Sequence, residues 1–165
     1  EMGTATFIVE ITKPFLNGAW IPLIVFFIAC LLSFATGTSW GTMAILMPIA
    51  IPLAAAASEV SGVLTPTIIA TIGSVLGGAI FGDHCSPISD TTILASTASG
   101  SDHIAHVTTQ MPYAITVAVA GAIFGYLPFA FGVPVWLSLI IGSAGLIIFI
   151  YFYGKKLDDD GNIVK

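Results

Sequence analysis

Long apolar segments fill most of this sequence and decide what it can fold into. They cover residues 16–35, 43–57, 63–81, 111–131 and 134–153. A helix of about 20 apolar residues crosses the hydrocarbon core of a bilayer. Only 8% of the residues are charged, whereas soluble domains carry about 25%. We therefore predict an all-α polytopic membrane protein with about four to six membrane segments, since helices satisfy their own main-chain hydrogen bonds in lipid.

The first interruption of this apolar pattern runs from Thr36 to Thr42. It has no charge, but it contains two glycines and several hydroxyl side chains. The apolar segment after it, residues 43–57, contains Pro48 and Pro52 and is short for a full span. A neutral, hydroxyl-rich break of this kind is typical of non-helical backbone beside a buried cavity. An ordinary polar turn between two helices is the alternative interpretation.

The second interruption runs from Gly82 to Thr92 and carries two acids, Asp83 and Asp90. Pro87 lies between the acids and prevents a regular helix through that point. The apolar stretch that follows, residues 91–97, forms about two helical turns and is too short to cross a membrane alone. We therefore predict two broken or re-entrant elements, followed by two uninterrupted spans at 111–131 and 134–153.

Carboxylates inside apolar sequence point to an ion path. A charge at membrane depth costs about 2.5–3.5 kcal/mol on insertion scales, so such residues usually mark a route for ions or substrates. A free aspartic acid has a pKa of about 3.9. Burial raises that pKa toward the range in which the carboxyl group can both take up and release a proton. A buried carboxylate can then hold either a proton or a hard cation. Hydroxyl groups are suitable additional ligands for that cation, and they are present at Ser86, Ser89, Thr91 and Thr92.

The two acids also have simpler interpretations. Asp90 directly precedes a short apolar helix and would serve as its N-cap. Asp83 would be an interfacial residue if the loop lies in water. His84 is a candidate proton relay. Asp83 and Asp90 are the candidate ligands of a hard cation.

Other chemistry has weaker support. Zinc ligands are normally spaced so that they converge, and the three consecutive residues Asp83, His84 and Cys85 generally diverge. His103 and His106 have only Asp102 nearby. No oxyanion motif accompanies a Cys85–His84 pair. We therefore predict no catalytic residues, no enzyme activity and no cofactor.

The ends of the sequence suggest how the chain is organised. We predict an N-terminal interfacial segment at 1–14, a transmembrane transporter domain at 15–154 and a cytoplasmic tail at 155–165. Lys155 and Lys156 directly follow the last span, which favours a cytoplasmic C-terminus. The sequence starts Glu1-Met2, so we expect it to be part of a longer polypeptide. The lipid bilayer is the predicted partner, and the absence of arginine and of a basic patch argues against nucleic acid.

The polar motifs together resemble the NhaC-type Na+/H+ antiporter family. The resemblance rests on residues 38–48, 82–92, 102–103 and 110–113, which read TSWGTMAILMP, GDHCSPISDTT, DH and QMPY. It covers roughly residues 31–113. The resemblance implies a fold of two halves with inverted topology, each with a broken helix or hairpin near the midplane. This chain is similar to the C-terminal half, so the missing N-terminal half or a second subunit is an expected partner.

The resemblance also implies a set of ion-site residues and a function. When the family's motif is transferred to this sequence, five candidate residues lie in the second interruption. Two residues of the first interruption would face them across the cavity. The candidates are Asp83, Ser86, Ser89, Asp90 and Thr91, with Thr38 and Ser39 opposite. The implied function is a secondary transporter that exchanges Na+ for H+ across the cytoplasmic membrane. Sodium is then the only expected metal, with Asp83 and Asp90 as its candidate ligands, and Na+ and H+ are the transported ions.

Two alternatives remain open at this stage. One is a sodium- or proton-coupled exchanger of small carboxylates such as malate and lactate, because the family contains members of that kind. An organic anion needs positive partners, and no membrane-embedded Lys or Arg is present in this chain. The other is an inactive fragment or a non-transporting membrane subunit.

Overall fold

The computed structural model describes residues 17–58 and 64–154, together with positions 7, 10, 11, 156–157 and 163–164. Its elements, in chain order, are η1 (Gly18–Trp20), α2 (Ile21–Thr36), α3 (Ser39–Ala57), α4 (Pro66–Cys85), α5 (Asp90–Ser99), α6 (His103–Gly121), η2 (Ala122–Tyr126), α7 (Leu127–Ala130), α8 (Val135–Tyr153), β1 (Lys156–Leu157) and β2 (Ile163–Val164). The two short strands pair antiparallel after the last helix. Most of the predicted segment 1–14 and of the tail 155–165 lies outside the described residues.

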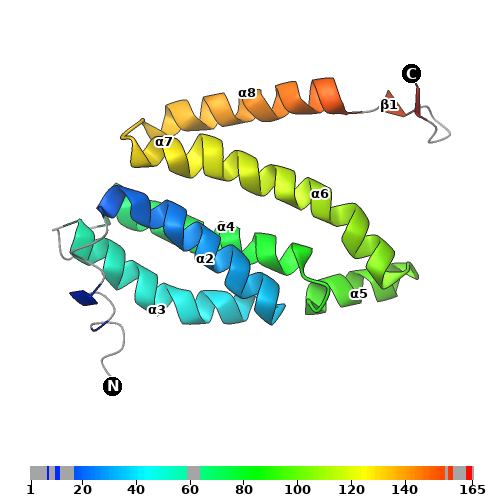
Figure 1. Cartoon of the computed structure of the whole chain (residues 1–165), viewed down its shortest axis with the longest axis horizontal. Helices are drawn as coiled ribbons and strands as arrows, with labels where there is room; N and C mark the ends of the chain where they lie inside the picture. The colour runs from blue at the N-terminus through cyan, green and yellow to red at the C-terminus, as the bar shows by residue number, and fades with distance from the viewer. Residues whose placement is uncertain are drawn as a thin grey trace.

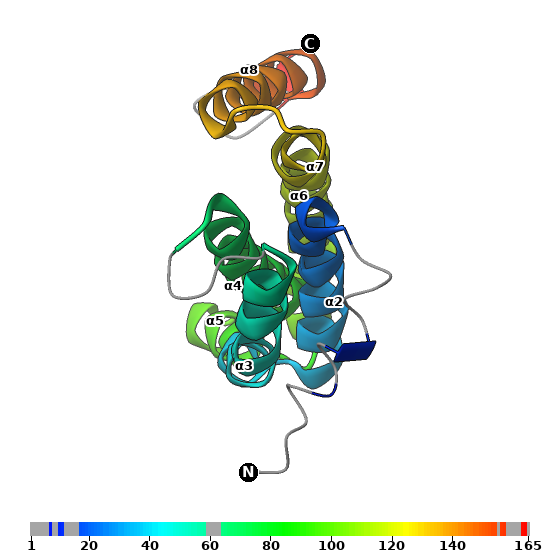
Figure 2. The same cartoon turned by 90° about the vertical axis from the view of Figure 1, so that its left-hand side faces the viewer.

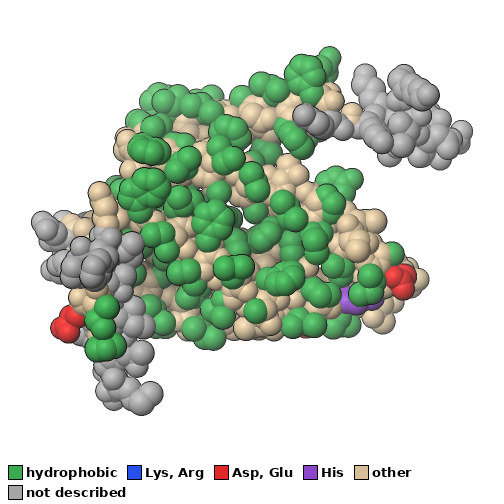
Figure 3. All heavy atoms as spheres, viewed as in Figure 1, with side chains coloured by type: hydrophobic (Ala, Val, Ile, Leu, Met, Phe, Trp, Pro, Cys, Tyr) green, Lys and Arg blue, Asp and Glu red, His purple; other side chains and the backbone are tan. Residues whose placement is uncertain are grey.

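Within the described ranges, five helices are long and apolar enough to cross a membrane. They are Gly18–Thr36, Ser39–Ala57, Pro66–Cys85, His103–Ala130 and Val135–Phe152. This number lies inside the predicted range, so the all-α polytopic membrane class is confirmed. The space-filling view agrees, since apolar side chains cover the face in Figure 3 and its few acidic side chains lie at the two ends.

The helices form successive layers. In Figures 1 and 2, α6 and α7 lie between α8 on one side and the pair α2–α4 on the other, with α3 farthest from α8. The main core joins α2, α3 and α4. It consists of the buried residues Ile21, Val25, Ala50, Leu53, Ala54, Ile68 and Val75.

Two glycines bring α4 against the backbone of α2. A Cβ atom placed on Gly78 would lie 2.5 Å from the Phe26 carbonyl oxygen, and one on Gly82 would collide with the Cys30 carbonyl oxygen. Small residues at such crossings are typical of helix pairs in membranes. The Ser33 hydroxyl donates a hydrogen bond of 2.6 Å to the Ala79 carbonyl across the same crossing. The C-terminal end of α4 is therefore tightly placed relative to α2.

The first predicted interruption is only two residues long. Gly37 ends α2 with φ of 69°, and Thr38 caps α3 by accepting a hydrogen bond from the Gly41 amide. The prediction of a short element at 43–57 is wrong, because α3 begins at Ser39 and has 19 residues. It continues through Pro48 and Pro52. A proline removes one main-chain hydrogen bond, yet α3 stays helical there, and Ala50 and Leu53 beside the prolines are buried in the core.

The second predicted interruption is confirmed, but it starts later than predicted. Helix α4 includes Gly82 to Cys85, and the break between α4 and α5 consists of residues 86–89. Ser86 is extended, with ψ of 127°, because the residue before a proline avoids the helical region. Helix α5 has 10 residues, too few to cross alone. In Figure 1, α4 and α5 together run alongside α6 and α7, as a broken helix.

Residues 103–110, which precede the predicted span at 111–131, are helical as well. Asp102 caps α6 by accepting a 2.8 Å hydrogen bond from the Ala105 amide, so α6 begins at His103. The predicted span at 111–131 is confirmed and extends further toward the N-terminus. It contains a π-helical turn, where the Leu127 amide donates to the Ala122 carbonyl. Pro128 follows directly, and a proline disrupts the regular hydrogen bonds of the preceding turn.

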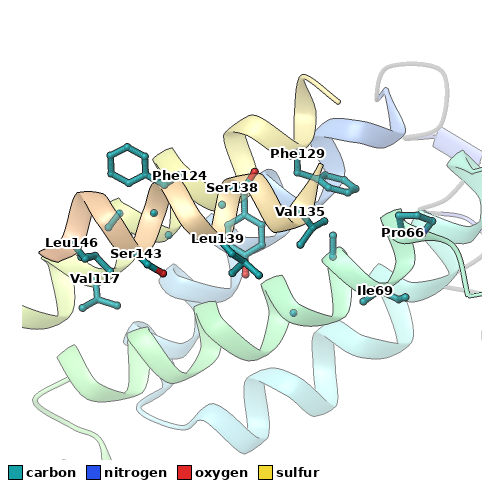
Figure 4. A pocket seen from close by; sticks show the side chains of 17 residues that line it. Pro66, Ile69, Val117, Phe124, Phe129, Val135, Ser138, Leu139, Ser143 and Leu146 are labelled. Atoms are coloured by element: carbon teal, nitrogen blue, oxygen red, sulfur yellow. The ribbon is translucent and has the colours of Figure 1, made fainter. Parts of the chain in front are cut away.

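A groove of about 700 Å³ lies between α4, α6–α7 and α8 (Figure 4). Its walls are apolar, with small residues such as Gly73, Gly121 and Gly142. Ser138 of α8 also lines the groove and is 6% exposed. Within the described part of the chain, its hydroxyl oxygen has no hydrogen-bond partner.

We expect Ser138→Ala to raise the free energy of unfolding by about 1 kcal/mol. The change removes a buried polar atom that lacks a partner, which costs about 1–3 kcal/mol when left unsatisfied, and alanine is also the better helix former. The measurement is unfolding of the detergent-solubilised protein by titration with a denaturing detergent. Ser143→Ala is the control, since Ser143 is exposed on the same helix. A loss of stability in Ser138→Ala would contradict the expectation.

Candidate functional site

Asp83 is a buried carboxylate that has no cationic side chain as a partner in the described part of the chain. It lies in the last turn of α4 and is 3% exposed. From residue 14 to residue 154 the sequence contains neither lysine nor arginine. A buried charge normally requires a compensating charge and hydrogen bonds. The partners of Asp83 are therefore decisive for its chemistry.

Three hydroxyl groups donate to this carboxylate. Ser89 donates to Oδ1 at 2.7 Å, while Ser39 and Thr91 donate to Oδ2 at 3.1 Å and 3.2 Å. The hydroxyl oxygens of Ser89 and Thr91 are themselves 2.8 Å apart. We call Ser39, Asp83, Ser89 and Thr91 the Asp83 cluster. The cluster is an oxygen-only set, which is the ligand type preferred by hard cations.

Helix ends bring the cluster together. Ser39 is the first residue of α3, Ser89 is the N-cap of α5, and Thr91 lies in the first turn of α5. The N-terminal end of a helix carries partial positive charge. The N-terminal ends of α3 and α5 therefore place partial positive charge near the carboxylate, whereas Asp83 itself lies in the C-terminal turn of α4, which carries partial negative charge.

The cluster has a buried side and an accessible side. Ser39 and Ser89 are buried, whereas Thr91 is exposed in this chain. The Thr92 hydroxyl, which is buried, donates to the main-chain carbonyl of Asp83 at 3.5 Å. Of the three hydroxyl donors, Thr91 is the exposed one in this chain.

The other predicted site residues lie outside these hydrogen bonds. Ser86 is buried, but its hydroxyl donates to the Phe34 carbonyl of α2 at 2.8 Å and so anchors the loop. Thr38 caps α3. His84 is exposed, and its Nδ1 lies 3.0 Å from the Ile80 carbonyl oxygen. Asp90 is exposed, and its carboxylate accepts a 2.8 Å hydrogen bond from the neighbouring Thr91 amide.

The two predicted carboxylates therefore have different surroundings. Asp90 is the first residue of α5, and the N-cap position considered for it belongs to Ser89. Of the predicted set, the structure joins Asp83 with Ser39, Ser89 and Thr91. Asp90 takes no part in the hydrogen bonds that join these four residues.

His103 contacts the loop of the site but was absent from the predicted set. Its Nε2 lies 2.7 Å from the Pro87 carbonyl oxygen, and its Nδ1 lies 3.1 Å from the Ser96 hydroxyl. The only available signal was the Asp102-His103 pair among the polar motifs. That pair does not by itself indicate a contact with a loop 16 residues away.

Comparison with known proteins decides the family. A family model described as "Na+/H+ antiporter family" matches residues 1–131. The chain belongs to this family. The resemblance inferred from the polar motifs is thereby confirmed.

The similar proteins that we compare with this member of the Na+/H+ antiporter family are much longer than this chain. An uncharacterized protein of Haemophilus influenzae is 39% identical over 156 residues, which are 94% of this chain and 29% of that protein. The malate-2H(+)/Na(+)-lactate antiporter of Bacillus subtilis is 39% identical over 106 residues, or 64% of this chain and 21% of that protein. An uncharacterized Na(+)/H(+) antiporter of H. influenzae is 39% identical over 103 residues, or 60% and 20%. The chain thus spans less than a third of the length of these relatives. No solved structure matches it.

The segment shared with the Na+/H+ antiporter family contains the whole Asp83 cluster. Residues 1–131 include α2 to α7, and α8 begins after them. The buried carboxylate and its three hydroxyl donors therefore lie in the part of the chain that defines its family.

Proposed function

We propose that the polypeptide containing this chain is a secondary transporter that exchanges Na+ for H+, with Asp83 as the group that holds either cation. The observation that carries this proposal is the burial of Asp83 among hydroxyl groups. Residues 14–154 contain no lysine or arginine that would neutralise it. A mobile cation would supply positive charge at this site in addition to the helix ends.

Competition for one carboxylate provides the exchange. A hydroxyl group has one donor hydrogen and two acceptor lone pairs. The hydroxyls of Ser39, Ser89 and Thr91 donate to the ionised carboxylate when it is free, and their lone pairs can turn toward Na+ when it binds. A proton on the carboxylate removes the charge that attracts Na+. Because the two cations exclude each other at Asp83, transport of one is coupled to release of the other.

We propose the cytoplasmic membrane as the location, with a cytoplasmic C-terminus. The two lysines after α8 support this orientation through the positive-inside tendency. The remaining part of the polypeptide, or a second subunit, supplies the other wall of the cation path. This proposal agrees with relatives that are more than three times the length of the matched segment.

A second candidate is sodium-coupled exchange of small carboxylates. The observation in its favour is the relative from Bacillus subtilis, whose name states a malate-2H(+)/Na(+)-lactate antiporter. An organic anion needs positive groups, and in this chain helix N-termini are the available ones within the spans. The cation site at Asp83 serves both candidates, and only the organic substrate distinguishes them.

Flux measurements in vesicles test the function. The protein is reconstituted with a pH-sensitive dye inside acidic vesicles, and Na+ is added outside. We expect Na+, without any organic anion, to make the lumen more alkaline, while protein-free vesicles do not respond. A response that requires malate or lactate in addition to Na+ would favour the second candidate. If the lumenal pH does not respond under any of these conditions, both candidate functions are rejected. A non-transporting subunit would then be the remaining interpretation.

A further inference from the structure

The loop at residues 86–89 places two of the three hydroxyl donors on Asp83. It ends at Ser89, and Thr91 follows in the first turn of α5. At its start, the Ser86 hydroxyl anchors the loop to α2. Between these two anchors lie Pro87 and Ile88, and both are exposed. A Cβ atom on Gly37 would lie 2.7 Å from the Ile88 carbonyl oxygen, so the end of α2 also packs closely against the loop at Ile88. Pro87 has a separate contact.

That contact comes from His103, the first residue of α6. Its Nε2 is 2.7 Å from the carbonyl oxygen of Pro87 in the loop. Its Nδ1 is 3.1 Å from the hydroxyl of Ser96, which is 2% exposed and lies in α5. One imidazole ring therefore connects the loop, α5 and the start of α6.

The chemistry of the partners determines the hydrogens on the ring. A carbonyl oxygen only accepts hydrogen bonds, so Nε2 must carry a hydrogen and donate it to Pro87. The Ser96 hydroxyl also lies 3.0 Å from the Ile93 carbonyl oxygen, so it can donate its one hydrogen there and accept from Nδ1, or donate it to Nδ1. The contact to Pro87 is therefore compatible with the neutral and the protonated imidazole.

We propose that His103 is a positioning residue for the cation site. By holding the Pro87 carbonyl and the Ser96 hydroxyl, it keeps the loop and α5 where Ser89 and Thr91 reach Asp83. His103 does not touch the carboxylate, and its effect passes through the loop. This inference rests on the proposed role of Asp83 in cation exchange.

Amide variants of different reach test the two contacts separately. The side chain of His103→Gln extends far enough to keep a donor near the position of Nε2, and so retains the contact to Pro87. The side chain of His103→Asn ends near the position of Nδ1 and loses that contact. His103→Phe keeps an aromatic ring but has no ring nitrogen, so it loses both hydrogen bonds. His106→Phe is the matched control, because the described structure records no hydrogen bond from the His106 side chain.

Two measurements are made on the reconstituted full-length protein. The first is hydrogen–deuterium exchange of peptides that contain the Thr92 and Ile93 amides, which hydrogen-bond to the Ser89 hydroxyl and carbonyl. The second is the Na+ concentration that gives half-maximal exchange. We expect faster amide exchange and an increase of about tenfold in half-saturating Na+ for His103→Phe and His103→Asn. His103→Gln and His106→Phe should both resemble the unmodified protein.

Several outcomes would overturn the proposal. Unchanged amide exchange in His103→Phe would show that the hydrogen bonds of His103 do not hold the loop. Faster amide exchange with unchanged half-saturating Na+ would show that the loop does not position the site. If His103→Phe fails to fold, equal behaviour of the Asn and Gln variants would overturn it instead. If the unmodified protein shows no Na+-driven flux, the proposed function fails. The amide exchange would then still decide whether His103 holds the loop, and the positioning role at a cation site would be withdrawn.

Discussion

Replacing Asp83 by asparagine is expected to reduce Na+-driven proton exchange to the level of protein-free vesicles. Asparagine has nearly the shape of aspartate, but its side-chain amide neither loses nor takes up a proton at the pH of the measurement. The substitution therefore removes the only group in the Asp83 cluster that binds both cations. The measurement is the lumenal pH response to added Na+ in reconstituted vesicles.

The same variant should remain folded. The asparagine oxygen still accepts the Ser89 hydrogen bond, and its amide can donate to the hydroxyl oxygens of Ser39 and Thr91. Because a buried charge is removed as well, we expect the free energy of unfolding not to fall. A variant that is inactive and also unfolded would leave the activity result without meaning, so stability is measured on the same preparation.

Asp90→Asn distinguishes the geometry of the structure from the sequence pattern. Asp90 is exposed and accepts a hydrogen bond from the amide next to it, at the start of α5. We therefore expect this variant to retain most of the flux and to lose about 0.3–1 kcal/mol of stability from the helix start. Equal loss of flux in both variants would show that both carboxylates belong to the site, as the motif predicted. Full flux in Asp83→Asn would reject Asp83 as the exchange site.

Gly82→Ala is expected to lower the free energy of unfolding by about 3 kcal/mol, at the upper end of the usual cost of overpacking. A Cβ atom on Gly82 would collide with the Cys30 carbonyl oxygen and would lie 2.6 Å from both the Phe34 amide nitrogen and the Ser33 Cβ. Two of these three atoms belong to the backbone, so α2 and α4 would have to separate. The measurement is unfolding by a denaturing detergent. Flux should fall as well, because Asp83 is the next residue.

The matched control is Gly73→Ala on the same helix. A Cβ atom on Gly73 would have no neighbour within 4 Å, and alanine is favoured over glycine in a helix by about 1 kcal/mol. We expect this variant to be as stable as the unmodified protein or more stable. Similar destabilisation of both variants would mean that the cost comes from the helix backbone and not from the crossing of α2 and α4.

Local sequence was a good guide to the spans and a poor guide to their ends. The apolar segments predicted the membrane class, and Pro87 predicted the break between α4 and α5. The position of that break was missed because Gly82 and Asp83 were read as loop residues. In the structure they continue α4, where Gly82 is packed against α2. Likewise, Ser39 and Thr42 look like turn residues, but with Thr38 as N-cap they begin α3.

What the sequence by itself determined is a membrane protein with acids at a chain break and hydroxyl groups nearby, because hydrophobicity, proline geometry and the cost of charge in lipid act locally. Only the tertiary structure decided which acid is buried and which hydroxyls reach it. Ser39 is 44 residues from Asp83, and the two meet because the start of α3 packs beside the end of α4. Asp83 and Asp90 flank the same loop, yet one is buried and the other exposed. Long-range packing of helix ends makes that difference, and no local pattern of residues contains it.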